Sequence, residues 1–186
     1  MIEKTVFYGI LVLAIVWVIP TSAQVYMTTV GIATFTSDAP LELISASSDE
    51  LSGAIDISDN RFAFRIPNKS FIGFNSQLQQ EHFYENYVET DKYKYSSFQG
   101  KIIEKIDLSG TNPQYLRAKG ALSIHGVEQE RIVKATLVVE KDKLIVLCEF
   151  TVPLEDHDIR IPNVVYQKIA EVIDVEVNAE LILKTD

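Results

Sequence analysis

The chain has 186 residues, with 17 basic and 26 acidic side chains and a formal net charge of −9. A chain of this length can bury a core large enough to fold as one domain without cross-links. The acidic balance argues against nucleic acid as a partner, because a surface that binds the phosphate backbone must be basic. Cys148 is the single cysteine, so an internal disulfide is excluded. We expect one domain stabilised by packing alone.

The N-terminus has the pattern of a secretory signal peptide. An apolar run over residues 6–19 follows Lys4 and is itself followed by Pro20 and small residues. The run is shorter than a bilayer-spanning helix requires, and the small residues suit signal peptidase. A retained single-helix anchor is the alternative, which the lack of a basic cluster after the run disfavours. We predict a signal peptide at 1–23, a domain at 24–186, no membrane span after processing, and a periplasmic or secreted protein.

Strand patterns dominate the rest of the chain. In the last of them every second residue from Ile173 to Leu183 is apolar and the residues between are mostly polar, so one face is dry and the other wet. The same alternation places Phe62 and Leu116 on the inner faces of their strands. Segments that mix β-branched or aromatic residues with alternating polarity cover residues 31–35, 51–57, 62–66, 98–106, 114–124, 130–140, 143–150 and 173–184.

Short polar or glycine-bearing segments separate these strands. Examples are 58–60, 125–126 and 141–143. Such short connections join antiparallel neighbours. About eight amphipathic antiparallel strands either stack as a sandwich or close into a barrel, and the alternation by itself leaves both arrangements open.

Two helical segments interrupt the strands. The first begins near Ser76, which forms a capping-box pattern with Gln79, and continues to about residue 87 without Gly or Pro. The second begins after Pro162, since proline is favoured as the first residue of a helix, and covers residues 163–170. We therefore expect a short helical insertion and a second short helix near the C-terminus.

The histidines are the residues best suited to polar chemistry. His125 precedes Gly126 in a predicted turn, where it either bonds to the backbone or contacts a ligand head group as a pH-sensitive gate. His82 and Glu85 have spacing that two metal ligands could use, but no motif supplies a third. His157 lies among carboxylates in a polar turn that is typical of a solvated loop. The pattern predicts no catalytic residue and no metal.

Four segments occur in a distinctive order: residues 31–46 (GIATFTSDAPLELISA), 70–101, 121–127 (ALSIHGV) and 158–177. The most specific part is EHFYENYVETDKY followed by SSFQGKI. In these segments the chain resembles the YceI-like family of exported, lipocalin-like proteins that bind polyisoprenoids. The resemblance implies a mainly β fold, an eight-stranded antiparallel lipocalin-like barrel, with an apolar tunnel whose mouth lies near the helical insertion. It also implies that copies of the protein can form a homodimer.

Two positions depart from the family pattern. Lys94 stands where relatives usually carry proline, and Glu128 begins a pair where relatives commonly carry a threonine and a lysine. The second change removes a basic residue, which weakens the expectation of an anionic head group more than that of an apolar tail.

The interior decides the function. An eight-stranded barrel is either filled by its side chains or left open for one slender ligand. The residues alone favour a filled core, whereas the resemblance implies a bound polyisoprenoid or quinone-like lipid and no other cofactor. We predict non-catalytic carriage of this lipid. The alternatives are an envelope stress or interaction protein with a solid core, and an enzyme that uses a histidine. The predicted ligand-binding residues are Phe62, Phe64, Ile66, Phe71, Phe74, Phe83, Tyr87, Phe98, Leu122, Ile124, His125 and Phe150.

Overall fold

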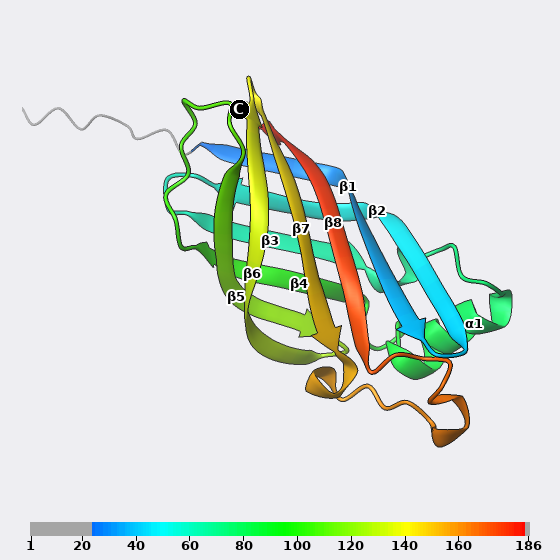
Figure 1. The fold of residues 1–186 in the computed structure, drawn as a ribbon. Helices are drawn as coiled ribbons and strands as arrows, with labels where there is room; N and C mark the ends of the chain where they lie inside the picture. Colours follow the sequence, from blue (N-terminus) through cyan, green and yellow to red (C-terminus); the bar gives the residue numbers. More distant parts are fainter. Residues whose placement is uncertain (1–23, 185–186) are drawn as a thin grey trace, which may run out of the picture.

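Eight strands form a closed antiparallel barrel in the computed structural model, which describes residues 24–184 (Figure 1). Each strand pairs with its neighbours along the chain, and β8 pairs with β1 to close the wall. The predicted mainly β, eight-stranded antiparallel barrel is confirmed, and the sandwich is excluded. The strands are β1 (Val25–Ala39), β2 (Glu42–Asp56), β3 (Arg61–Pro67), β4 (Tyr95–Ile102), β5 (Gln114–Ile124), β6 (Val127–Glu140), β7 (Lys143–Pro153) and β8 (Val172–Leu183).

The alternation of polar and apolar residues sets the register of the wall. On β8, Val177 lies opposite Cys148 of β7, and Leu181 lies opposite Leu144. All four side chains face the interior, as the period of two predicts. The charged residues between them on β8, such as Glu180, face solvent and pair with β7 side chains such as Lys143 at 2.9 Å.

The first two strands are longer than the sequence predicted. They form one hairpin with its turn between Ala39 and Glu42, where we predicted only residues 31–35 and 51–57 as strand. Irregular pairing around Gly31 breaks the alternation of β1, and serines in β2 lower its apparent strand preference. The hairpin therefore forms because its cross-strand neighbours pair along its whole length.

The helical insertion begins where it was predicted. α1 (Gln77–His82) continues into a π-helical turn, η2 (Phe83–Tyr87), and a short 3-10 turn, η1 (Asn68–Ser70), precedes it. The Gln79 amide N–H donates to the Ser76 hydroxyl at 3.2 Å, as in a capping box. The side chain of Gln79 accepts from the amide of Asn75 instead of from Ser76, so the box is displaced by one residue.

The second predicted helix is wrong. In place of a helix over 163–170 the chain forms a single 3-10 turn, η4 (Asn163–Val165), and another 3-10 turn, η3 (Leu154–His157), precedes it. Consecutive β-branched valines lower helix preference here. The backbone beyond them bonds to the barrel: the Gln167 carbonyl accepts from the Leu41 amide at 2.9 Å, and the Ala170 amide donates to the Ser37 hydroxyl at 2.8 Å.

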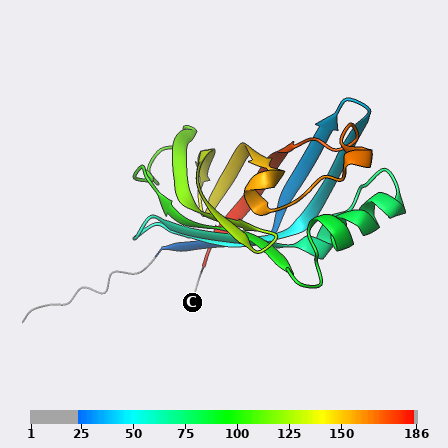
Figure 2. The same ribbon diagram turned by 90° about the horizontal axis from the view of Figure 1, so that it is seen from below.

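The two ends of the barrel differ. α1 and the loop that carries η3 and η4 lie at one end, beside the β1–β2 turn (Figure 2). We call this the mouth end. At the opposite end, where β8 finishes, the core is solid: Leu144 and Leu181 have no exposed surface, and Tyr26 and Val139 are buried in the same apolar cluster. Helices within residues 24–184 are all too short or too polar to cross a membrane.

Candidate functional site

The barrel encloses a cavity of about 590 Å³. All eight strands contribute to its wall, and so do α1, η2 and the C-terminal loop. Polar residues of the mouth end, including Glu42, Gln79 and Lys168, line it, whereas Leu144 and Leu181 at the opposite end do not. The cavity therefore starts at the mouth end and stops against the solid core.

The wall of the cavity is apolar, and several of its side chains face empty space. Phe64, Phe98 and Phe150 point inward from their strands yet are only half-buried, while Leu144 further along is fully buried. Inward side chains of a closed barrel keep accessible surface only where the interior is not filled. The interior is hollow, contrary to what the residues alone suggested.

Eleven of the twelve predicted site residues line this cavity. His125 is the exception, because it lies in the turn between β5 and β6 outside the lining. That these residues contact a ligand stays a prediction. The eleven are Phe62, Phe64, Ile66, Phe71, Phe74, Phe83, Tyr87, Phe98, Leu122, Ile124 and Phe150.

An aromatic cluster forms the side of the cavity next to α1. Phe35 of β1 lies at its centre, with its ring centroid 5.1 Å from that of Phe83 and 5.3 Å from that of Phe71. Phe74 contacts both Phe35 and Phe83. Sequence reasoning missed Phe35, although its place between Ala33 and Ser37 on the inner face of β1 could have revealed it.

The segment that carries Phe71 and Phe74 lies where β3 would otherwise continue. β3 ends at Pro67, while β2 extends beyond it toward the mouth end. There Ser47 of β2 forms a single bridge with Ile72, and the segment from residue 71 to η2 covers the wall. The mouth is thus bounded partly by a helical segment instead of by continuous sheet.

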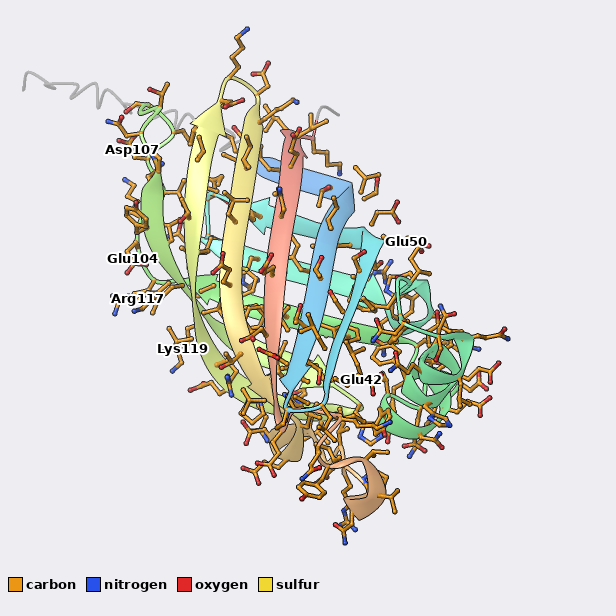
Figure 3. The ribbon with its side chains drawn as sticks, turned by 45° about the vertical axis from the view of Figure 1, so that its right-hand side comes forward. Glu42, Glu50, Glu104, Asp107, Arg117 and Lys119 are labelled. Atoms are coloured by element: carbon orange, nitrogen blue, oxygen red, sulfur yellow. The ribbon has the colours of Figure 1, made fainter. Side chains whose placement is uncertain are left out.

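A polar group ties together the three segments around the mouth. The Gln79 side-chain amide on α1 donates to the Glu42 carboxylate at 2.5 Å, and the Lys168 ammonium of the C-terminal loop lies 4.0 Å from the same carboxylate. The Asn75 side chain donates to the Leu43 carbonyl at 2.8 Å. Figure 3 shows Glu42 at this end of the barrel, beside α1.

His125 holds the β5–β6 turn in place. It has a φ of 52° and Gly126 one of 73°, as expected of a tight turn. Its Nδ1 lies 3.0 Å from the His157 carbonyl and its Nε2 lies 2.7 Å from a Glu89 carboxylate oxygen. Both ring nitrogens are thus engaged by groups from outside the turn, one in η3 and one in the segment after η2. The geometry favours the structural interpretation of His125.

The other two histidines are placed differently. His157 is fully buried, and its Nδ1 lies 3.1 Å from the Val127 carbonyl, which indicates that Nδ1 carries a proton and donates it. Burial lowers the pKa of His157. His157 therefore packs as part of η3. The prediction that it lies in a solvated loop is wrong. His82 is exposed at the mouth and lines the cavity.

Two other side chains of the cavity wall, the Cys148 thiol and the Tyr87 hydroxyl, are neutral. Burial raises the pKa of the Cys148 thiol to about 11, so the thiol stays protonated at neutral pH. Burial also raises the pKa of Tyr87. Among residues 24–184, no three His, Cys, Asp or Glu side chains lie close enough together to hold a metal ion. The cavity thus offers mainly apolar contact.

Comparisons with solved structures show the same fold. A polyisoprenoid-binding domain from Saccharophagus degradans, implicated in plant cell wall breakdown, aligns with a TM-score of 0.72 at 13% identity, over 88% of this chain and 100% of that chain. BcnA of Burkholderia cenocepacia aligns with a TM-score of 0.65 at 11% identity, over 81% and 95%. A YceI protein of Campylobacter jejuni aligns with a TM-score of 0.56 at 16% identity, over 98% and 94%.

Comparison with protein families assigns the chain to a family, which structural similarity at such low sequence identity cannot do alone. No curated protein matches the chain. The family model described as the YceI-like domain matches residues 22–181, which spans every strand of the barrel except the last two residues of β8. The chain therefore belongs to the YceI-like domain family.

Proposed function

We propose that the protein binds a long apolar lipid of the polyisoprenoid class inside its barrel and carries it without changing it chemically. The observation that carries this proposal is the cavity of about 590 Å³ that opens at one end and stops against a solid core at the other. A slender chain fits a space of this shape. The solid-core alternative predicts a filled interior, which this cavity contradicts.

The energetics of burial suit a tail without polar groups. Each buried CH₂-sized group gains about 0.8 kcal/mol. Ten such groups gain roughly 8 kcal/mol, the free energy of a micromolar complex, before the cost of ordering the chain is subtracted. Affinity of this size needs no hydrogen bond to the tail, which agrees with the apolar wall.

Two groups of aromatic residues in the cavity wall are assigned to two parts of the ligand. The pair Phe62 and Phe98, with ring centroids 4.8 Å apart, lies on strands β3 and β4 and contacts the tail. The cluster around Phe35 and Phe83 contacts the part nearer the mouth. His125 is assigned a structural role instead of a ligand contact.

The head group is expected to be neutral or weakly polar. At the mouth the Glu42 carboxylate already interacts with the nearby Lys168 ammonium and with Gln79. A phosphate would meet this acidic group in a protein of net charge −9. A quinone or a polyprenol matches the site better than a polyprenyl phosphate.

We also propose that the protein acts outside the cytoplasm, in the periplasm or after secretion. The support is the signal-peptide pattern of residues 1–23, which lie outside the described part of the chain. Pairing of two copies, which the family resemblance implies, stays a prediction.

Lipid extraction tests the proposal directly. Protein purified from its own cells without detergent is analysed by native mass spectrometry, and its lipids are extracted and identified. We expect one bound isoprenoid lipid per chain and uptake of a fluorescent polyprenol by the emptied protein. Absence of both a co-purified lipid and polyprenol uptake would reject the proposal.

A further inference from the structure

Large apolar side chains lie exposed around the cavity mouth. They come from three segments: Leu41 in the β1–β2 turn is 65% exposed, Leu78 on α1 is 60% exposed, and Val164 and Tyr166 in the C-terminal loop are 89% and 62% exposed. We call these four residues the apolar rim. Apolar groups that gather around the entrance of a cavity indicate an interaction surface.

The apolar rim is held in a fixed arrangement. The Leu41 amide donates to the Gln167 carbonyl at 2.9 Å, which places the hairpin turn beside the loop that carries Tyr166. Glu42 joins that loop to α1 through Lys168 and Gln79. Figure 2, which views the molecule from below, shows α1, the loop that carries η3 and η4, and the β1–β2 turn at the same end of the barrel.

The apolar rim continues into the cavity. Leu78 is exposed at the surface and also lines the cavity wall. In the C-terminal loop, Val165 and Ile169 line the cavity beside the exposed Val164. Apolar side chains therefore extend from the surface to the interior, beside the polar residues that also line the mouth.

A ligand of the proposed class is dissolved in a bilayer and not in water. Crossing water would cost about 0.8 kcal/mol for each CH₂-sized group that leaves an apolar environment. Direct contact between the mouth and a membrane avoids this cost. This step rests on the proposed function.

We propose that the apolar rim docks on the surface of a lipid bilayer whose head groups carry no net charge, so that the ligand passes directly between membrane and cavity. Tyr166 has the amphipathic ring that is favoured at membrane interfaces. The charged groups nearby are mostly acidic: Glu81 on α1 and Glu171 in the loop are exposed, and Lys168 is close to Glu42. An anionic membrane would repel this end.

Vesicle flotation tests the docking. Protein purified from its own cells is floated with phosphatidylcholine vesicles, and the transfer of a fluorescent polyprenol from those vesicles is timed. The test variant combines Leu41→Ser with Val164→Ser. The control combines Val30→Ser with Tyr115→Ser, because these residues are 73% and 82% exposed and lie outside the apolar rim. All proteins share one N-terminus, so any contribution of residues 1–23 cancels.

We expect the test variant to bind vesicles about 100-fold more weakly and to transfer the polyprenol correspondingly more slowly, at about tenfold for each side chain. The control should behave as the wild type. Replacing part of the phosphatidylcholine with phosphatidylglycerol should weaken binding. Wild-type binding by the test variant, or no flotation of the wild type, overturns the docking.

Two further measurements separate this proposal from its neighbours. Uptake of the polyprenol from cyclodextrin, without vesicles, reports on the cavity alone. If the wild type floats with vesicles but takes up no polyprenol from cyclodextrin, the lipid-carrying function is rejected and the docking stands. If the wild type is a dimer that does not float, and the test variant is a monomer, the apolar rim joins two copies and the membrane proposal is overturned.

Discussion

The solid end and the mouth end of the barrel are built from the same alternating strands, yet only one of them is filled. At the solid end Leu144 and Leu181 are fully buried, and Ile106 from the β4–β5 loop is buried in the same apolar cluster. At the mouth end Phe98 and Phe150 also point inward but stay half-buried. Large inward side chains are present in both halves, so the difference lies in what covers each end: the β4–β5 loop adds the buried Ile106 to the core at one, and a helical segment borders the opening of the other.

The largest expected effect comes from the solid end. We expect Leu144→Ala to lower the free energy of unfolding by about 2 to 5 kcal/mol, because it leaves a cavity that its neighbours cannot fill. Urea unfolding followed by circular dichroism measures the loss. A loss below about 1 kcal/mol would show that this end is not a rigid core.

A matched pair of tryptophan substitutions sharpens the contrast within one strand. Ala118 lines the cavity, whereas Lys119 points away from the barrel (Figure 3). Ala118→Trp should fill the cavity and weaken polyprenol binding by at least about 100-fold, which corresponds to about 2.7 kcal/mol. Lys119→Trp should bind as the wild type does. Equal fluorescence titrations for both variants would contradict the assignment of the cavity as the binding site.

The same Val→Ala substitution at the two ends compares how tightly each end is packed. Val139 is buried in the solid end, and Val146 is half-buried against the cavity. Val139→Ala should cost about 1 to 2 kcal/mol of unfolding free energy, and Val146→Ala less than half as much, since its methyl groups already face empty space. Paired urea titrations without ligand decide between them. Similar losses at both positions would mean that the empty barrel collapses around its cavity.

Acid should loosen the mouth end through His157. Its pKa is lowered in the folded protein by burial, which outweighs the raising effects of the hydrogen bond to Val127 and of the Asp156 carboxylate, so the unfolded chain binds this proton more readily. The stability it supports is complete above pH about 6.5 and is lost as the pH falls toward the lower folded value, by at most about 1.4 kcal/mol per pH unit. The amide of His157→Asn can replace the Nδ1 donor. We expect the melting temperature of this variant to fall less than that of the wild type between pH 7.5 and pH 5. An unchanged slope in this variant would assign the acid sensitivity to other groups.

The sequence predicts the wall of the barrel better than its ends. The alternation in β3, β5 and β8 placed Phe62, Leu122 and Leu181 inside, because each lies in an uninterrupted run with a period of two. It missed residues 25–30 of β1, next to the irregular pairing around Gly31, and it failed at residues 163–170, where backbone bonds to the barrel replace those of a helix.

The hollow interior could not be predicted from the residues. Whether inward aromatic side chains fill the barrel depends on which loops close its ends, and this is a property of long-range contacts. Phe35 shows the same limit, since its partners Phe71, Phe74 and Phe83 come from a segment that lies far away in the sequence.

The pairing of β8 with β1 makes the wall a continuous ring of backbone hydrogen bonds. A ligand that left through the wall would have to break the hydrogen bonds between two strands, whereas one that leaves through the open end breaks none of them. For the proposed function, loading and emptying are thereby separated from unfolding, so one copy of the protein could serve many cycles of exchange without ever exposing a sheet edge to aggregation.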